Sequence, residues 1–514
     1  MGQLGIIAAT IVVMAVVPLL FVIESSLELD STQWARLWTN RLPELLGNTL
    51  GLATLVAIFS FVFGVSSAWL VARIDFTGRT LAQWLLLLPL TIPTYVFAHI
   101  YTSTTARDGF IGSTWTALFG SQAPDIYNVY GAAFILSLAG FSYIYLLVRA
   151  ALSHSTRTLE ESARLQGAGR LEVFWRINLP LLRPAIAAGL AVIVLHVLSD
   201  FGAVSMLRFQ TFTLAIYTQM SGRMDYQGAA GLSLVLIILS LTFLIGERIF
   251  RTRQRYYASR QSLEVTLKPA TTGQTVMIWA WLGSICFFSF LLPLGWMLSW
   301  TWQSLLNESL GAEFWGYAIN SGVISFTAAT IALVAAFPIA FFHSRKHTRT
   351  STAFMHLSSV GFALPGPVVA LGVLSFILAQ LPFLYGTLAA LVLAMVIRFL
   401  PLAIQSQEAA LQQLTPSLEQ AGRVFGATPL ENLRLVILPV IRSGLASAWV
   451  LVFIDTLKEL PATLLLRPTG FDTLPVRIWI EASEEMLELA APAALVLVIG
   501  TLPAIWIMMK TERH

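Results

Sequence analysis

The chain has 514 residues, of which 56% are hydrophobic and only 11% are charged, and its formal net charge is +4. Soluble domains carry about 25% charged residues, so this composition excludes a water-soluble fold of this size and requires lipid as part of the solvent. A single cysteine, Cys286, excludes an intrachain disulfide framework, and the seven histidines are too scattered to form a ligand cluster.

The chain contains twelve apolar segments that approach the length of about 20 residues needed to cross a bilayer. They lie near 4–23, 48–72, 82–103, 130–150, 184–206, 229–248, 275–298, 318–342, 355–380, 385–404, 442–465 and 489–509. A signal peptide is the alternative for the first segment, but that segment lacks a basic start and is too long. We therefore predict an all-α polytopic membrane protein with about 12 transmembrane helices.

The basic residues indicate the orientation of these spans. With both termini inside, 22 of the 31 Lys and Arg residues fall on the inner side, 7 fall outside and 2 fall within spans. Because inner loops carry the excess of positive charge, we predict that both termini are cytoplasmic.

The sequence divides into two halves that repeat each other. Residues 251–273 are polar and basic, which predicts a cytoplasmic linker between a first half at 1–250 and a second half at 274–514. Asn48-Thr49 matches Asn320-Ser321, and Pro93 matches Pro365, both at an offset of 272. Each half has an even number of spans, so the two six-helix repeats are parallel. The two prolines indicate bends within spans, which either serve gating or follow from packing alone.

The strongest repetition lies on the cytoplasmic side. Residues 160–186 read EESARLQGAGRLEVFWRINLPLLRPAI, and residues 419–445 read EQAGRVFGATPLENLRLVILPVIRSGL. In the first copy Leu171, Phe174 and Trp175 share one face of a short helix. The second copy contains a capping box, Thr428-Pro429-Leu430-Glu431. Each copy therefore predicts a short helix whose apolar face binds a partner.

These two copies resemble the signature loop of the permeases of binding-protein-dependent ABC importers. The first copy keeps the family spacing, with Glu161-Ser162-Ala163, Gly167 and Ile177-Asn178-Leu179-Pro180. The second has Gln420-Ala421-Gly422 in place of the usual E-A-A. The resemblance implies a type I ABC importer permease fold and a coupling helix in each half that docks on an ATPase. The residues expected at this contact are Glu161, Ala163, Gly167, Ala168, Phe174, Trp175, Leu179, Pro180, Gln420, Ala421, Gly426, Ala427, Leu430, Leu433, Leu438 and Pro439.

The same resemblance implies partners. The sequence contains no G-x-x-x-x-G-K-[ST] phosphate loop, so we expect the chain to be no enzyme and to bind no cofactor. ATP and Mg would be used by two copies of a separate ABC ATPase subunit. A periplasmic substrate-binding protein is expected at outer loops such as 104–129 and 207–228. We expect contact with membrane lipid, none with nucleic acid, and a place in the bacterial inner membrane.

Two further segments, 198–220 and 455–479, resemble the permeases for ferric iron; related permeases for thiamine, phosphonate and polyamines remain alternatives. Asp200 and Glu459 correspond between the halves at an offset of 259, and intramembrane charge indicates function. Ferric iron favours oxygen ligands, so the two carboxylates are candidates for a translocation path. His196, Asp455 and Lys458 are weaker candidates. The alternative is a structural or gating role, since Asp455 and Lys458 can form a local ion pair. No stable metal site is expected.

Two other classes of protein are weighed against an importer permease. A secondary transporter of the 6+6 type also has parallel halves, but it predicts no ATPase partner and no repeated coupling loop. A membrane-embedded enzyme would need a cluster of acids, bases or metal ligands at one membrane face, which the sequence does not suggest.

Overall fold

The computed structural model describes residues 2–153, 163, 165–252, 267–308, 310–346, 348–412, 414, 418, 420, 422 and 424–511. These form two compact units. Unit 1 comprises residues 1–39, 215–237 and 307–514, and unit 2 comprises residues 40–214 and 238–306. Each unit thus draws on both predicted halves. The domain boundaries at 250 and 274 stay a prediction. They were drawn from the sequence repeat, whereas the two units are defined by contacts between residues, and the two criteria divide the chain differently.

Unit 2 is built from helices of the first half together with the helices that open the second. Its elements are α3 (Leu42–Arg73), β1 (Ile74–Asp75), α4 (Arg79–Leu85), η1 (Leu88–Thr91), α5 (Thr94–Thr105), α6 (Phe110–Phe119), α7 (Val129–Ser153), α9 (Arg170–Val173), η2 (Phe174–Asn178), α10 (Leu179–Ser199), α11 (Gly202–Met206), β2 (Lys268–Pro269), α14 (Thr272–Cys286), η4 (Phe287–Leu291) and α15 (Leu292–Leu306).

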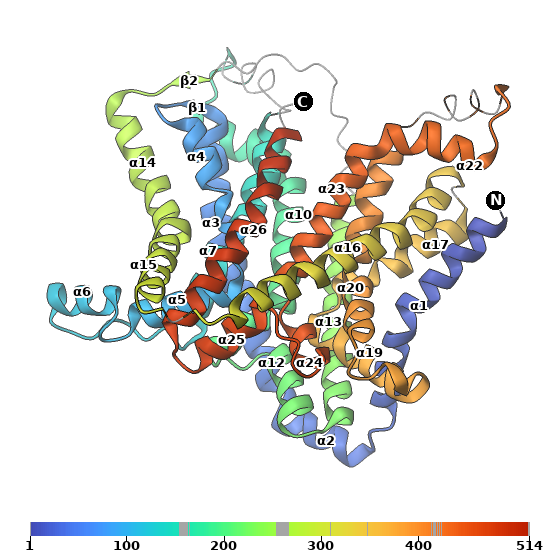
Figure 1. Cartoon of the computed structure of the whole chain (residues 1–514). Coiled ribbons are helices and arrows are strands. Elements are labelled where there is room, and N and C mark those ends of the chain that lie inside the picture. The colour runs from blue at the N-terminus through green and yellow to red at the C-terminus, as the bar shows by residue number, and fades with distance from the viewer. Residues whose placement is uncertain are drawn as a thin grey trace. The chain divides into compact units, whose positions relative to one another are not determined.

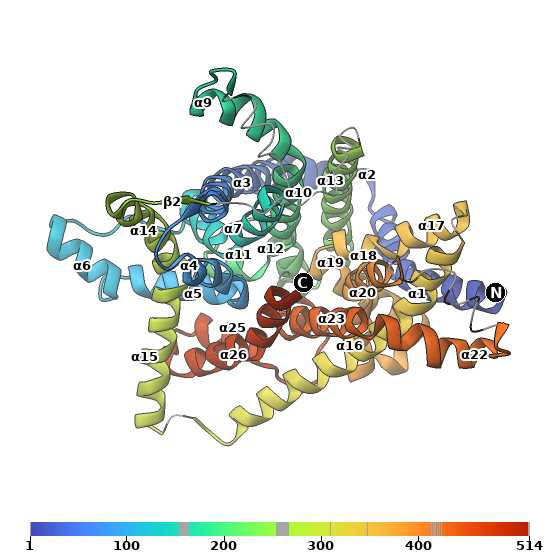
Figure 2. The ribbon, with the colours of Figure 1, turned by 90° about the horizontal axis from the view of Figure 1, so that it is seen from above.

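Helix α7 lies at the centre of unit 2, and α3 and α10 pack against it (Figure 2). In the most apolar 18-residue stretch of α7, 72% of the residues are buried. Burial on most sides explains why this helix is apolar around its whole circumference. Gly64 on α3 makes the close approach possible, because a Cβ at that position would lie 2.7 Å from the Cβ of Ile144. Phe63 and Phe141 meet edge to face across the same contact, with ring centroids 6.4 Å apart.

Unit 1 combines the first helices of the chain with most of the second half. Its elements are α1 (Gly2–Leu27), α2 (Ser31–Asn40), α12 (Phe212–Tyr217), η3 (Thr218–Gly222), α13 (Tyr226–Thr252), α16 (Glu313–Arg345), α17 (Arg349–Ser358), α18 (Val360–Ala363), α19 (Gly366–Gln380), η5 (Pro382–Leu384), α20 (Leu388–Gln412), α22 (Pro429–Asn432), η6 (Leu433–Ile437), α23 (Leu438–Leu457), α24 (Pro461–Leu466), α25 (Leu474–Ser483) and α26 (Leu487–Thr511). Helices α2, α12 and α13 each run across a boundary between the units.

Helix α20 has the same central place in unit 1 that α7 has in unit 2. It packs between α16 and α23, and 61% of its most apolar window is buried. Helix α1 packs along α19 (Figure 1), with Phe21 and Phe376 in edge contact at 5.6 Å between ring centroids. The first apolar segment is therefore part of the folded unit, as expected of a spanning helix.

The twelve predicted spans correspond to apolar helices in the described part of the chain. Nine helices are long and apolar enough to cross a membrane, and one further pair, Arg79–Thr91 and Thr94–Phe119, meets the same criteria when taken together but is bent by 96° at the break between its two parts. Two shorter apolar helices, Gly366–Gln380 and Leu489–Pro503, occupy the remaining positions. The all-α membrane fold is thus confirmed, with one small exception: β1 and β2 form a parallel pair.

The predicted bends lie at the two matched prolines. Pro93 and Pro365 are both in extended conformation immediately before a helix, with ψ of 149° and 147° respectively. A proline removes one backbone donor and disfavours the helical conformation in the residue before it, so each span is interrupted there. Helix α5 consequently starts directly after Pro93, and α19 starts directly after Pro365.

Candidate functional site

The two predicted coupling segments make the same turn. Gly167 has φ of +89° and Gly426 has φ of +84°. In each copy the backbone N–H that follows the glycine reaches back to close a helix end: Ala168 donates to the carbonyl of Ala163, and Ala427 to that of Gly422, both at 3.0 Å. This is the Schellman arrangement, in which a left-handed residue ends one helix and redirects the chain.

A short helix follows each turn, and it does not end before the membrane span. Helices α9 and α22 pass through the π-helical turns η2 and η6 directly into the spanning helices α10 and α23. The second copy has the predicted capping box: the Thr428 hydroxyl accepts from the backbone N–H of Glu431, whose carboxylate accepts from the N–H of Thr428. Leu179-Pro180 and Leu438-Pro439 form the first turns of α10 and α23.

Large apolar side chains are exposed at both segments. Trp175 is 59% exposed and Leu430 is 73% exposed, whereas Leu433 is half-buried. The most exposed of them, Leu165 at 89% and Phe425 at 90%, were not predicted from the sequence. Leu165 lies two residues before Gly167 and Phe425 lies one residue before Gly426, so a large apolar residue just before such a glycine is the signal that could have found them. Exposed apolar surface of this kind is typical of a contact with another protein or with the membrane.

Some predicted coupling residues cannot be placed. Glu161, Ala421 and the side chain of Phe174 lie outside the described residues, and so does most of the predicted linker, at 253–266. Gln420 lies in the described part and is exposed.

The glycine that stands for the second alanine of E-A-A in the second copy has a steric cause. A Cβ on Gly422 would lie 2.5 Å from Oδ1 of Asn432, so alanine does not fit without displacing that side chain. In the first copy the corresponding position is Ala163, and the residue matching Asn432 is Val173, which is buried. The second copy therefore combines a smaller residue, Gly422, with a polar residue, Asn432, where the first copy has Ala163 and Val173 at the matching positions of the repeat.

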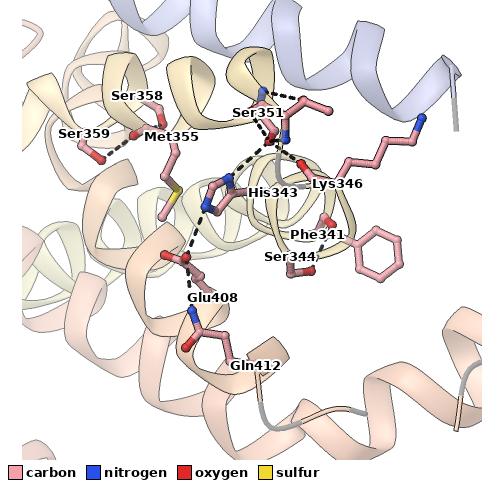
Figure 3. Close-up of polar contacts among 11 residues, drawn as sticks. Phe341, His343, Ser344, Lys346, Ser351, Met355, Ser358, Ser359, Glu408 and Gln412 are labelled. Atoms are coloured by element: carbon pink, nitrogen blue, oxygen red, sulfur yellow. Dashed lines mark hydrogen bonds and ion pairs between the residues drawn. The ribbon is translucent and has the colours of Figure 1, made fainter. Parts of the chain in front are cut away.

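Polar contacts hold the end of α20 that leads into the second coupling segment (Figure 3). Nε2 of His343, on α16, lies 3.6 Å from Oε1 of Glu408, and Nε2 of Gln412 donates to the same oxygen at 3.3 Å. The other ring nitrogen of His343 lies 3.4 Å from Oγ of Ser351, on α17. These contacts join three helices immediately before the segment that turns at Gly426.

The Asp200 carboxylate lies where α10 ends and is almost fully buried. Oδ1 accepts from the backbone N–H groups of Ala203 and Val204, at 3.0 and 3.2 Å. Oδ2 accepts from the hydroxyl of Thr94, the first residue of α5 after Pro93. From the position before the N-cap, Asp200 therefore binds two free N–H groups in the first turn of the short helix α11, and it joins that helix to α5.

Glu459 occupies the matching place after α23 but has a different partner. Oε1 accepts from the backbone N–H of Ala462 at the start of α24, and Oε2 lies 3.3 Å from Nε of Arg398 on α20. Gly366 stands where the first half has Thr94, and a Cβ there would lie 2.1 Å from Nη1 of Arg398. Glycine at this position therefore gives the guanidinium its place beside Glu459.

Of the weaker path candidates, His196 and Asp455 lie one turn before these carboxylates, and Lys458 directly precedes Glu459. His196 is exposed on α10, with its ring 6.0 Å from that of Tyr143. Asp455 and Lys458 are half-buried at the end of α23 and interact electrostatically with each other, and Arg398 adds its field at Asp455. The structure thus groups Asp455, Lys458, Glu459 and Arg398 in unit 1, and His196 with Asp200 in unit 2. Among the described residues, no group of three or more His, Cys, Asp and Glu could hold a metal ion.

The repeated arrangement matches a known family. The chain fits the family model described as "Binding-protein-dependent transport system inner membrane component" twice, at residues 60–256 and 328–513. The chain belongs to this family. It is therefore a permease, a multi-pass component of the inner membrane, and the predicted fold of two permease repeats is confirmed.

The permease has full-length and half-length relatives. It is 31% identical to the "Fe(3+)-transport system permease protein FbpB 2" of Haemophilus influenzae over 498 residues, 96% of this chain and 95% of that protein. It is 27% identical to the "Ferric transport system permease protein FbpB" of Actinobacillus pleuropneumoniae, over 82% of this chain and 64% of that one. The "Molybdenum transport system permease protein ModB" of Escherichia coli is 34% identical over 40% of this chain and 93% of its own length.

Among solved structures, the permease is similar to a chain of a bacterial alginate ABC transporter in complex with a periplasmic protein bound to an alginate pentasaccharide. The TM-score is 0.40 at 19% identity, and the match covers 46% of this chain and 88% of that one.

Proposed function

We propose that this permease supplies both halves of the membrane path of an ATP-driven importer for ferric iron. The observation that supports ferric iron as the substrate is the match to a ferric permease over nearly the whole of both chains. The molybdenum permease matches less than half of this chain. A periplasmic ferric-binding protein delivers the ion on the outer side, and both termini lie in the cytoplasm.

The two coupling segments are the docking sites for two copies of an ATPase subunit, which uses ATP and Mg. Support comes from the repeated turn, the exposed apolar side chains beside it, and the direct continuation into α10 and α23. Because each short helix runs unbroken into a span, a displacement at the ATPase moves the outer end of that span. This link is the basis for alternating access, in which ATP binding opens the path outward and hydrolysis returns it inward.

Asp200 and Glu459 act in this scheme by positioning the backbone. Asp200 uses both oxygens on protein donors, and Glu459 uses one on a backbone N–H and the other on Arg398. A carboxylate engaged in this way is a poor ligand for a passing cation, since binding the ion would break the cap. We therefore favour the structural alternative for both carboxylates over direct contact with the substrate.

ATPase docking is tested by capture of the ATPase subunit on the purified permease. Leu430→Glu places a charge in an apolar contact, and we expect ATPase capture to fall at least about tenfold because a carboxylate there would be desolvated without a partner. Leu118→Glu is the matched control, since Leu118 is 72% exposed and lies on α6, in the predicted outer loop at 104–129. Equal capture by both variants would remove the second coupling segment as a docking site.

A further inference from the structure

Two neighbouring residues make the same contact at the outer end of α3 and of α16. Nδ2 of Asn48 donates to the backbone carbonyl of Gln210, and Nδ2 of Asn320 donates to that of Asp472, each at 3.0 Å. The partners are far away in the sequence but lie within the same unit in each copy. The matched Asn48-Thr49 and Asn320-Ser321 pairs therefore have a shared structural task.

The hydroxyl of the next residue completes the contact. The backbone N–H of Phe212 donates to Oγ1 of Thr49 at 3.4 Å, and that of Leu474 donates to Oγ of Ser321 at 2.7 Å. Phe212 and Leu474 are the first residues of α12 and α25, whose N–H groups have no partner inside their own helices. The hydroxyl of one helix thus caps the start of another. We name each set of two hydrogen bonds an outer clamp.

Both clamps bind only backbone groups, and the hydroxyl bond is longer in the first clamp, 3.4 Å at Thr49, than in the second, 2.7 Å at Ser321. Thr49 is 2% exposed and Ser321 is 1% exposed, so water does not compete for these hydroxyls. Oγ of Ser321 also donates to the carbonyl of Tyr317, which leaves a lone pair aimed at Leu474. Because the clamped groups are a carbonyl and an N–H, the side chains at the clamped positions are free to differ between the halves.

The clamps close segments that begin at the buried carboxylates. The first outer segment runs from Asp200 to Phe212, and the second from Glu459 to Leu474. In the first, the hydroxyl of Thr213 also donates to the carbonyl of Asp200. Each outer segment is therefore fixed at one end to α10 or α23, and at the other end to α3 or α16.

The clamps complete a physical connection from the coupling segments to the outer side. Helices α10 and α23 begin at the coupling segments and end at the outer segments. An outer segment held only by these helices would follow their motion passively. Fastened to a second helix by the clamp, it converts a displacement of α10 against α3, or of α23 against α16, into a change of its own shape. Contiguous contacts of this kind between elements can carry a displacement from the coupling segments to the outer side.

We propose that Asn48–Thr49 and Asn320–Ser321 are positioning residues for import, which hold the outer segments so that a loaded binding protein and the ATPase subunits affect each other through α10 and α23. This inference rests on the proposed function and assigns to it four residues that lie in neither the coupling segments nor the candidate path.

The second clamp has additional support, so the two copies should differ in sensitivity. The side chain of Asp472 forms ion pairs with Arg467 and Arg477. Arg477 also bonds Glu481 at 2.9 Å and lies over the ring of Tyr317, 4.9 Å from its centroid. These contacts fasten the second outer segment to α16 even without Asn320. Loss of the first clamp should therefore have the larger effect.

The test uses the whole permease with its ATPase subunits in lipid vesicles, and compares ATP hydrolysis with and without the iron-loaded binding protein. The Asn48→Leu/Thr49→Val variant removes both clamp bonds at nearly constant volume. We expect the maximal stimulated rate to fall at least about fivefold, which is the factor for one net hydrogen bond of ordinary strength, since the variant removes two; the unstimulated rate and ATPase capture stay within about twofold of wild type. Asn320→Leu/Ser321→Val should lose less.

The conservative variants separate positioning from packing. Thr49→Ser and Ser321→Thr give each clamp the hydroxyl of the other, and both should keep the stimulated rate. Full stimulation in Asn48→Leu/Thr49→Val would overturn the inference, as would a parallel loss of unstimulated hydrolysis and capture, or a failure of Thr49→Ser to keep stimulation. A wild-type complex that captures no ATPase or ignores the binding protein would instead overturn the proposed function.

Discussion

Gly426→Val is expected to reduce import at least about tenfold, whereas Gly426→Asn keeps most of it. The residue has φ of +84°, and no atom of the described residues other than its chain neighbours lies within 4 Å of where a Cβ would be, so strain in the backbone decides the outcome and crowding does not. A left-handed conformation costs an ordinary residue about 1–2 kcal/mol, costs a β-branched residue more, and is tolerated by asparagine. Valine therefore favours another turn, which breaks the bond from Ala427 to Gly422 and redirects α22.

The same series applies to Gly167 and includes a charge. Gly167→Asp adopts the turn more readily than valine but places a carboxylate beside apolar side chains, so it should abolish ATPase capture or coupling. The control for ATPase capture is Gly120→Val, since Gly120 has φ of +65° but lies at the end of α6, in the outer loop at 104–129 and outside both coupling segments. Substrate uptake and ATPase capture are measured for all variants. Normal uptake by both Gly167→Asp and Gly426→Val would refute the role of the turns.

Glu459→Gln should destabilise the permease far more than the matched Asp200→Asn. The glutamine would leave Arg398, whose side chain is only 15% exposed, without its carboxylate, and an unpaired buried charge costs about 3–5 kcal/mol. Asp200 has hydroxyl and backbone N–H partners, so asparagine retains one acceptor and costs about 1–3 kcal/mol. The measurement is the unfolding temperature in detergent, together with the amount of protein in the membrane.

A double variant shows whether the cost arises from the stranded cation. Arg398→Met/Glu459→Gln removes both charges, and replacing a buried ion pair by apolar groups is often neutral or stabilising. We expect the double variant to recover most of the unfolding temperature lost in Glu459→Gln. If it is no more stable than the single variant, the ion pair with Arg398 does not explain the role of Glu459.

Much of the fold follows from the sequence because the bilayer imposes a strong pattern on it. A span must be apolar over about 20 residues and satisfy its own backbone, so hydropathy locates the helices. The breaks at Pro93 and Pro365 also follow from residue type. Which helices belong to which compact unit does not follow from the sequence. Helix α1 packs with α19, and α14 packs with α3, but the apolar pattern of a helix does not specify its neighbours.

The candidate sites show the same division. Gly167, Gly426 and the capping box at Thr428 were predictable because local conformation determines them. The π-helical turns at η2 and η6 were not, since they carry no residue signal, and they make the short helices continuous with the spans. The partners of Asp200 and Glu459 were also out of reach, because Thr94 and Arg398 lie far away in the sequence.

Uptake of radiolabelled ferric iron by iron-starved cells that lack only this chain tests directly whether the chain is the membrane path of a ferric importer. We expect that high-affinity uptake is lost, is restored by the wild-type chain and by Gly426→Asn, and is not restored by Gly167→Asp. Unchanged uptake in cells with no second ferric system would contradict the substrate, and thiamine, phosphonate and polyamine uptake by the same strains would be measured next.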